Sequence, residues 1–546
     1  MFTSIRVDPR ALSIRRRVGA APTRSSARVV FLIFSANAIE KRGETVLYIK
    51  SSTTESVCAC ERVSMVASRQ RSYQSALSLL SSLIRAPTAA APATATAATT
   101  TASTRYVDGF TAALEVALPR VGLTQVDMAR LRVVHVAGTK GKGSTCCMVE
   151  RILREAGYTT GLFTSPHLLD VTERVRLGGV PISSEVFTRH FWSLWDDLSA
   201  PSSSSSPASG DAPSASDGQD KEKPRDGDDA ARSVLGGDGM PGYFRFLTLL
   251  SLRVFLEAKV DVAILEVGLG GRLDATNVVA RPVVSGVALI DYDHCEILGN
   301  TLREIATEKA GIFKEVAPGI TLQSPPQPEE AAVALRAEAA RRKTALETAP
   351  SLDEYDNGDA VRIGLEGAHQ RVNAALAVAL SAKWMRVVSQ ADTADDVRDT
   401  HDARSEKSRR YADMILGDGS SGGASTKTLP EVVLHGLHRA SWPGRCQVVM
   451  RGKTAICLDG AHTPKSIKAC AAWFAERCGE KTRKRVLLFH CMEKRDPVQL
   501  MAPLAELHER VDFELALFVP RTSHIHIYCT LSLTAHAHIR VRGSSD

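Results

Sequence analysis

The feature that most constrains this chain is a glycine-rich turn, Gly138-Thr-Lys-Gly-Lys-Gly-Ser-Thr145. An apolar run at Leu131–Ala137 predicts a buried strand before the turn, and the pattern over Ser144–Ala156 predicts a helix after it. Polyphosphate binding needs backbone N–H groups that converge at a helix N-terminus, together with a lysine. The turn therefore predicts a phosphate-binding loop with Lys142 at the terminal phosphates, and a glycine turn without a ligand is the alternative. The residues expected to contact the phosphates are Gly141, Lys142, Gly143 and Ser144.

Strands and helices continue to alternate along the chain. Apolar runs at Val260–Val267 and Val283–Ile290 predict strands, and Phe244–Leu256 predicts a buried helix. This alternation predicts a parallel α/β sheet with its ligands at the carboxyl ends of the strands. A second, smaller Rossmann-like α/β domain is expected from Trp442 onward. Its strands are expected at Thr454–Leu458, Arg485–Phe489 and Phe513–Val519, and its helix at Ser466–Arg477.

Composition divides the chain into three parts. Residues 1–70 are expected to be a targeting or disordered N-terminus, residues 71–440 the phosphate-loop domain, and residues 441–546 the smaller domain. Polar stretches without large apolar residues are expected to be disordered insertions of the first domain, at about 86–104, 199–239 and 389–428.

The bulk properties are those of an ordinary globular protein, with 44% hydrophobic and 24% charged residues. The formal net charge is +7, but much of the arginine lies near the N-terminus, so the charge does not predict nucleic-acid binding. The 11 cysteines include no C-x-x-C pair, which argues against a zinc site and favours a reducing compartment. No apolar run approaches the roughly 18 residues that a spanning helix needs, so no membrane partner is expected.

The N-terminal segment has the composition of an organelle targeting sequence. Arginines recur there among small and hydroxyl residues, and Asp8 is the only acidic residue before Glu40. This composition predicts a mitochondrial location, alone or in addition to the cytoplasm. Two other interpretations stay open: a secretory leader with Val29–Phe34 as its apolar core, and a start with no targeting role.

Further motifs follow the glycine turn in order. They are Phe163-Thr-Ser-Pro-His-Leu168, Tyr243-Phe-Arg-Phe-Leu-Thr248, Glu266-Val-Gly-Leu-Gly-Gly-Arg-Leu-Asp-Ala-Thr-Asn277, Asp293-His294, Glu308-Lys-Ala-Gly311, Gly367-Ala-His-Gln370, Trp442-Pro-Gly-Arg445 and Leu458-Asp-Gly-Ala-His-Thr463. The turn itself departs from the common pattern G-x-x-x-x-G-K-[ST], because Gly143 separates Lys142 from Ser144. This ordered set, over roughly Tyr73–Pro520, resembles the folylpolyglutamate synthases, relatives of the Mur peptidoglycan ligases.

The resemblance implies an activity and its partners. Folylpolyglutamate synthases are ligases that form a C–N bond between L-glutamate and the γ-carboxyl of a folyl or tetrahydrofolyl (poly)glutamate. ATP is the co-substrate, the intermediate is an acyl phosphate, and Mg²⁺ and in some cases a monovalent cation take part. A monomer is expected. The alternatives are dihydrofolate synthase activity and an inactive ATP-binding homologue.

The resemblance also implies a magnesium site formed by Ser165, Glu266 and His294. Magnesium prefers oxygen ligands, so His294 is the least typical of the three. Each residue has a structural alternative: a turn hydroxyl for Ser165, an ion-pair partner for Glu266 and a helix cap for His294. Lys142, His294 and Lys309 are the implied catalytic residues. The family's counterpart of Lys309 is carbamylated, and an unmodified lysine in an ion pair is the alternative.

Several more residues match nucleotide-contacting positions of the family. Arg445 and Asp459 are implied as a pair at the nucleotide, with an interdomain ion pair as the alternative, and His462 is a candidate for the same site. Gln370 and Asn373 are further candidates, and a core-facing position is the alternative for both.

Two departures from the family pattern stand out. Asp291 occupies a position where the family usually has glycine, so its side chain is expected to crowd the turn. After Pro520 the resemblance stops, so the end of the smaller domain is expected to be atypical or incomplete.

Overall fold

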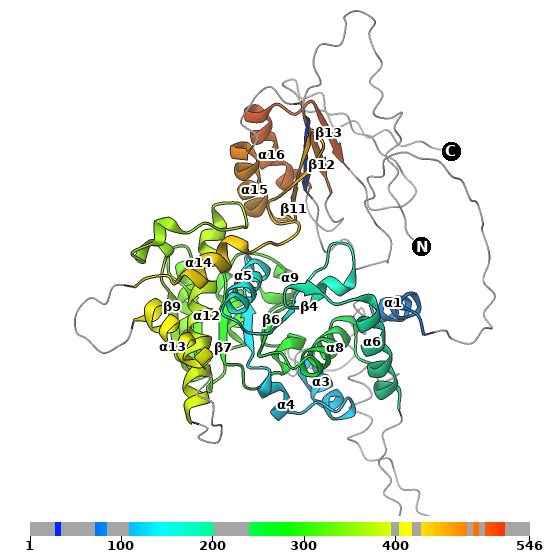
Figure 1. Ribbon diagram of the computed structural model, residues 1–546. Helices are drawn as coiled ribbons and strands as arrows, with labels where there is room; N and C mark the ends of the chain where they lie inside the picture. Colours follow the sequence, from blue (N-terminus) through cyan, green and yellow to red (C-terminus); the bar gives the residue numbers. More distant parts are fainter. Residues whose placement is uncertain are drawn as a thin grey trace, which may run out of the picture.

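A computed structural model of the chain describes residues 28–33, 71–84, 109–200, 240–394, 403–417, 427–477, 484–490 and 497–518. These residues form two α/β units, each built on its own sheet. Figure 1 shows the smaller unit standing on the larger one, joined to it by the chain that follows α14 (Glu431–Arg439). Both the parallel sheet and the second α/β domain predicted from the sequence are confirmed.

The larger unit contains an eight-stranded sheet in the order β5-β4-β3-β6-β2-β7-β8-β9. Six neighbouring strands run parallel, in the order β3, β6, β2, β7, β8 and β9. At the β3 edge, β4 and β5 extend the sheet by antiparallel pairing. The bounds are β2 (Val134–Ala137), β3 (Thr160–Phe163), β4 (Val175–Leu177), β5 (Val180–Pro181), β6 (Val262–Glu266), β7 (Val284–Val287), β8 (Gly319–Leu322) and β9 (Leu346–Ala349). The central strands are buried at every residue, which explains why they read as continuous apolar runs.

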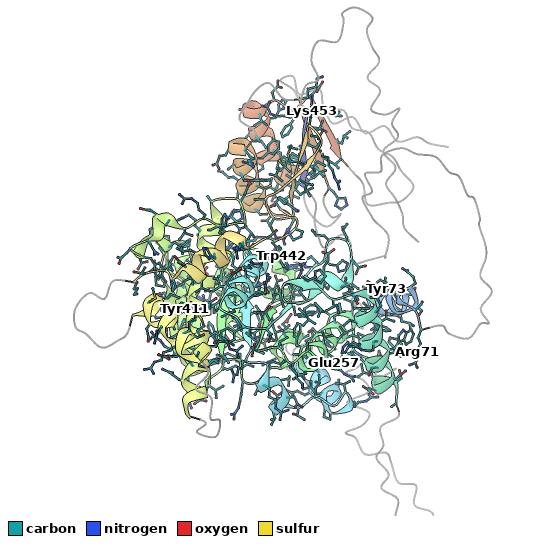
Figure 2. The ribbon with its side chains drawn as sticks, in the orientation of Figure 1. Arg71, Tyr73, Glu257, Tyr411, Trp442 and Lys453 are labelled. Atoms are coloured by element: carbon teal, nitrogen blue, oxygen red, sulfur yellow. The ribbon has the colours of Figure 1, made fainter. Side chains whose placement is uncertain are left out.

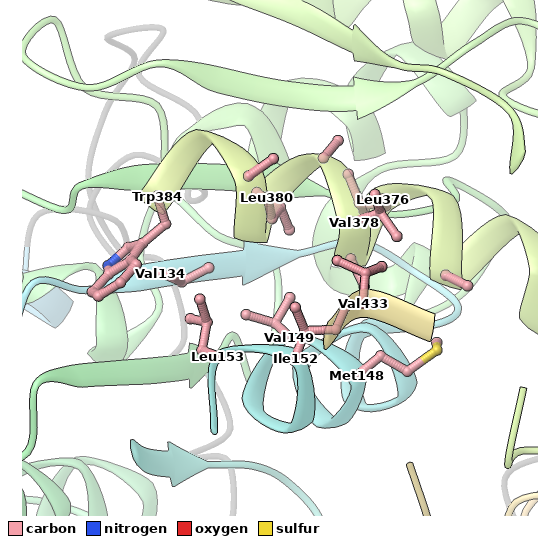
Figure 3. Packing of buried hydrophobic residues seen from close by; sticks show 14 of the residues in the cluster. Val134, Met148, Val149, Ile152, Leu153, Leu376, Val378, Leu380, Trp384 and Val433 are labelled. Carbon is pink, nitrogen blue, oxygen red and sulfur yellow. The ribbon is translucent and has the colours of Figure 1, made fainter. Parts of the chain in front are cut away.

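Helices cover both faces of this sheet, because alternate residues of a strand point to opposite sides. In β6, Val262 and Ile264 join one core and Ala263 and Leu265 the other. The first core lies under α5 (Lys142–Glu155), α12 (His369–Ala394) and α14. Figure 3 shows side chains of these three helices, among them Ile152, Leu380 and Val433, gathered beside Val134 of β2.

The second core lies under α1 (Tyr73–Ser82), α3 (Gly109–Arg120), α4 (Gln125–Arg130), α6 (Ser184–Ser199) and α8 (Tyr243–Glu257). A third cluster, with residues at the carboxyl ends of β2 and β7, joins α9 (Cys295–Leu298), α10 (Leu302–Ala310) and α11 (Glu329–Arg341). Short helical turns lie at Val171–Arg174, Ala275–Val278, Leu352–Glu354 and Gly358–Ala360. Across the described ranges, no helix has both the length and the apolar character that crossing a membrane requires.

The smaller unit contains a five-stranded sheet in the order β10-β11-β1-β12-β13. Its bounds are β10 (Gln447–Arg451), β11 (Thr454–Asp459), β1 (Arg28–Ile33), β12 (Lys484–Phe489) and β13 (Leu515–Phe518). All pairs are parallel except β10 with β11. The helices α15 (Pro464–Arg477) and α16 (Pro497–Val511) pack against the sheet.

The central strand of this sheet corrects one expectation. Residues 1–70 were expected to lie outside both domains, yet Arg28–Ile33 forms β1. The run Arg-Val-Val-Phe-Leu-Ile is rich in residues that favour strands, but the arginines around it dominate the composition. Its strand partners lie near the other end of the chain, so no local pattern identifies them.

A second expectation is corrected in the third predicted insertion, 389–428. There α12 continues to Ala394, and α13 (Ala403–Leu416) packs against it. Ala412 and Ile415 are fully buried, so a narrow apolar face holds a helix that looks polar overall. The other expectations for the N-terminus, for the insertions and for the chain after Pro520 concern residues outside the described ranges.

Candidate active site

The glycine turn forms a phosphate-loop geometry between β2 and α5. Gly141 has a φ of 87° and directly precedes α5, which begins at Lys142, two residues earlier than predicted. A Cβ at Gly141 would lie 2.0 Å from Oδ1 of Asn373, so only glycine fits there. The first N–H groups of α5 and Lys142 therefore sit at one end of the turn, as anion binding requires.

Two strand ends meet beside this turn. The backbone N–H of Ser165, after β3, donates to Oε2 of Glu266, at the end of β6, with an N···O distance of 3.0 Å. The carboxylate of Glu266 also faces Gly143, where a Cβ would lie 3.4 Å from the same oxygen. Burial raises the pKa of Glu266, while the charge of Lys142 acts to lower it. Ser165 and Glu266 thus lie beside the phosphate loop, and their part in a magnesium site stays a prediction.

His294 lies at the end of the neighbouring strand region, after β7. Its backbone is left-handed, with a φ of 52°, and it precedes α9 without a side-chain cap. Burial lowers the pKa of His294, Asp293 opposes this, and Lys309 and Lys142 lower it further, which favours a neutral ring. Within the described ranges, no group of three or more His, Cys, Asp or Glu side chains could hold a metal ion by itself.

Lys309 lies on α10 and is 4% exposed. Burial, and after it the charge of Lys142, lower its pKa to about 7. The glycine turn after β6 packs directly on its backbone, because a Cβ at Gly271 would lie 2.5 Å from the carbonyl oxygen of Lys309. An amine in this position is partly neutral near pH 7.

Asp293 connects the phosphate loop to the smaller unit. Its Oδ2 lies 3.1 Å from Nζ of Lys140 and 3.5 Å from Nε2 of His462. Burial acts to raise the pKa of Asp293, but the hydrogen bond with His462 and the charge of Lys140 hold it well below its usual range.

Beside Asp293, Oδ2 of Asp291 lies 3.9 Å from Nζ of Lys465 on α15. The side chain of Asp291 thus faces the smaller unit, and Asp291 is not among the residues with positive φ, so the expected crowding of the turn is not observed.

Arg445 and Asp459 lie near each other around Gly460 and Cys446, and their contact with a nucleotide stays a prediction. Oδ2 of Asp459 accepts from the N–H of Cys446 at 2.7 Å, and Oδ1 accepts from the N–H of Ala461 at 2.8 Å. Asp459 therefore shapes the loops around it, while Arg445 lies against Gly460, where a Cβ would be 2.4 Å from Nη1. The charge of Arg445 also acts to lower the pKa of Glu266.

Gln370 and Asn373 are buried at the start of α12, at 1% and 5% exposure. Nδ2 of Asn373 donates to Oε1 of Gln370 at 2.9 Å, and Asn373 closes against Gly141 as described. Both side chains are therefore buried, and Asn373 packs directly against the phosphate loop at Gly141.

The junction between the units is marked by Trp442, labelled in Figure 2, far from Lys453 at the outer end of the smaller unit. The guanidinium of Arg176 on β4 stacks on its ring, 4.6 Å from the ring centroid. A further contact joins the units where Nε1 of Trp473 donates to Oε2 of Glu366 at 2.7 Å. The hydrogen bond between Trp473 and Glu366 thus ties α15 of the smaller unit to the larger unit.

One organising residue was missed by the sequence analysis. Asp274 is fully buried within the turn after β6 and accepts from the N–H groups of Gly268, Leu269 and Thr276. Its signal was local: an aspartate followed two residues later by threonine after a glycine turn is typical of a side-chain-capped turn. Asp274 fixes the glycine turn that packs on Lys309.

Comparison with known proteins places this geometry in a family. No family model matches the chain. The human mitochondrial folylpolyglutamate synthase is 38% identical over 423 residues, which cover 76% of this chain and 63% of the relative. A folylpolyglutamate synthase of Arabidopsis thaliana is 36% identical over 501 residues, covering 85% of this chain and 74% of the relative.

Solved structures agree on the fold. A complex of a folylpolyglutamate synthase with AMPPCP and folate has a TM-score of 0.56 at 20% identity, and covers 84% of this chain and 91% of its own. The Mycobacterium tuberculosis folylpolyglutamate synthase bound to ADP has a TM-score of 0.56 at 21% identity, with 82% and 83% covered.

The fold thus defines a two-domain protein of the Mur ligase type. Within that class, the chain belongs to the folylpolyglutamate synthase family. It spans 62% to 63% of the length of the mammalian relatives.

Proposed function

We propose that this protein is an ATP- and Mg²⁺-dependent ligase that adds L-glutamate to the γ-carboxyl of folyl and tetrahydrofolyl (poly)glutamates. The observation that carries the proposal is the contact between Ser165 and Glu266 beside the N-terminus of α5. At this edge of the sheet, the phosphate loop lies beside a buried carboxylate and a buried lysine. Activation of a carboxylate by ATP requires such an arrangement. Membership of the family supports the same activity.

The reaction proceeds in two balanced steps. A γ-carboxylate oxygen of the folate attacks the γ-phosphorus of ATP, the bond from that phosphorus to the bridging oxygen breaks, and ADP leaves. The amine of glutamate then attacks the acyl carbon, phosphate leaves, and the nitrogen loses its proton. Lys142 and the first N–H groups of α5 stabilise the charge on the transferred phosphoryl group. Arg445 adds a second cation from the smaller unit and suits phosphate because its donors form a planar fork.

The donor set fits magnesium. Ser165, Glu266 and His294 would hold the ion, which supplies charge neutralisation at the phosphates when bound. Magnesium in such sites takes one or two carboxylates and completes its shell with water and phosphate oxygens. The single carboxylate of Glu266 close to the phosphate loop matches that preference, and a neutral His294 leaves a nitrogen lone pair available.

Lys309 carries a carbamate in the working enzyme. Its pKa of about 7 leaves a substantial neutral fraction at physiological pH, and only the neutral amine attacks carbon dioxide. The N–C bond forms as a C–O π bond of carbon dioxide opens, and the neutral amine releases one proton. Counted from the protonated lysine, two protons are lost, so a cation becomes an anion close to Lys142. Incubation with ¹³C-bicarbonate should give a carbamate signal in the ¹³C spectrum of the native protein that is missing from Lys309→Met. An identical spectrum for both proteins would contradict the carbamate.

The names of the relatives and the composition of the chain support a cellular location for the enzyme. The mammalian relatives are named as mitochondrial, and we place this protein in mitochondria, the cytoplasm or both. It is expected to act as a monomer, since the described catalytic residues come together within one chain.

A direct assay tests the proposal. Purified protein with MgATP and L-glutamate should release ADP and a lengthened folate when given a tetrahydrofolyl monoglutamate, and should be inert with dihydropteroate. Turnover with dihydropteroate alone would assign dihydrofolate synthase activity instead. ATP binding without ADP formation on either acceptor would identify an inactive homologue.

A further inference from the structure

The smaller unit is completed by a strand from the other end of the chain. β1 pairs along its whole length with β11 on one side and β12 on the other. Arg28 lies beside Thr454 and Lys484, and Ile33 lies beside Asp459 and Phe489. Without β1, the facing edges of β11 and β12 would both carry unpaired backbone groups in the middle of a sheet.

The side chains of β1 also fill the core of the unit. Phe31 is fully buried and Ile33 is 1% exposed. The ring of Phe31 stacks on Phe474 of α15, with 4.0 Å between centroids, and on Phe513, with 6.4 Å. The slot between β11 and β12 is therefore shaped for a short apolar strand with an aromatic residue at its fourth position.

This strand supports the part of the site that the smaller unit supplies. Ile33 is the register partner of Asp459, whose carboxylate holds the loops at Cys446 and Ala461. The carbonyl oxygen of Ile33 accepts from the N–H of His490 at 3.0 Å, which extends the pairing past the end of β12. Without β1, the end of β11 that carries Asp459 would lose its neighbouring strand on that side.

We propose that residues 28–33 act as a donor strand, which binds in a strand-accepting slot between β11 and β12. Non-covalent contacts are sufficient to hold it there, so its covalent connection to α1 is not required. The occupant of the slot is the chain's own segment, because residues 34–70 are long enough to reach Arg71 from Ile33. A targeting segment that is removed on import would then have to end before Arg28. Removal of a segment that includes residues 28–33 before the unit folds would leave the slot empty and disable the smaller unit.

The inference is tested on the folded full chain by cutting the tether. A specific protease site is inserted between residues 34 and 70, the purified protein is cleaved, and the products are separated by native size-exclusion chromatography. The N-terminal fragment should co-elute with the body at the mass of one chain, and should separate only in denaturant. The readout is physical association, so it does not depend on ligase activity.

Variants at Phe31 give the matched comparison. In the nicked Phe31→Leu protein the fragment should stay bound, whereas in nicked Phe31→Asp it should dissociate at least tenfold faster, because a charge would be buried in the aromatic core. Release of the unmodified fragment under native conditions would overturn the proposal. Co-elution at the mass of two chains would overturn it as well, since the strand would then be exchanged between copies.

Discussion

The carboxylate of Glu266 accepts a hydrogen bond from the backbone N–H of Ser165, so the ends of β6 and β3 are joined directly beside the phosphate loop. Parallel strands bring their carboxyl ends to one edge, and here that edge holds an acid that is 4% exposed. The relationship brings residues a hundred positions apart together at one edge of the sheet, and the charge of Glu266 is central to the proposed function.

Replacing Glu266 with glutamine should separate activity from stability. The amide oxygen can still accept from Ser165, but the negative charge that we propose for magnesium binding is lost, so kcat should fall by about 10²-fold or more. Because burial raises the pKa of Glu266, its charge is unfavourable to the fold, and the thermal midpoint of unfolding should stay the same or rise. The exposed Glu257→Gln is the control, and full activity in Glu266→Gln would refute the assigned role.

Lys142→Met should abolish turnover while leaving the fold intact. The methionine keeps the length of the side chain but removes the cation at the transferred phosphoryl group, and we expect a loss of about 10²-fold or more in kcat/KM. Lys468→Met, an exposed substitution on α15, serves as the control. Circular dichroism should be unchanged in both variants, and comparable turnover in the two would place the phosphates elsewhere.

The two aspartates at the domain junction should differ sharply in importance. Asp293 is half-buried between Lys140 and His462, so Asp293→Asn leaves a partly buried cation without its partner and should cost about 2 kcal/mol of stability. Asp291 faces the largely exposed Lys465 at 3.9 Å, so Asp291→Gly should change the free energy of unfolding by less than about 1 kcal/mol. Denaturant titrations of both variants measure this contrast, and equal effects would contradict it.

Lys309 should give the free energy of unfolding a defined pH dependence. Its pKa is about 7 in the folded protein against 10.5 in a free side chain, so the unfolded state binds more protons between these values. Stability should therefore rise as the pH increases from about 7 to about 10 and level off above that. In buffer free of carbon dioxide, Lys309→Met should lack this component and be the more stable protein below pH 7. Parallel curves for the two proteins would show that Lys309 is not buried as a free amine.

Much of the site was accessible from the sequence because its residues lie at strand ends and glycine turns. The run before Gly138 predicted β2, and the ordered motifs predicted that Ser165 and Glu266 would lie together. The part of His294 in a shared magnesium site stays a prediction. The start of α5 differs from the prediction only in that it lies at Lys142 and not at Ser144. The left-handed Gly141 ends the turn earlier than the sequence pattern of the helix indicated.

The remaining features depend on contacts between distant segments. The pairing of β1 with β11 and β12 leaves no trace in the local pattern around Phe31. The occupation of both oxygens of Asp459 by backbone N–H groups could be seen only once the loops at Cys446 and Ala461 were placed. The fall in the pKa of Lys309 likewise depends on how deeply α10 is buried.

The central claim is that one site uses ATP to activate a folate carboxylate, and oxygen transfer tests it most directly. A folate labelled with ¹⁸O in its γ-carboxylate is incubated with MgATP, L-glutamate and the purified protein, and the released nucleotide and phosphate are analysed by mass spectrometry. The account predicts unlabelled ADP and inorganic phosphate that carries one ¹⁸O for each amide bond formed. Label in AMP, or phosphate without label during productive turnover, would contradict it.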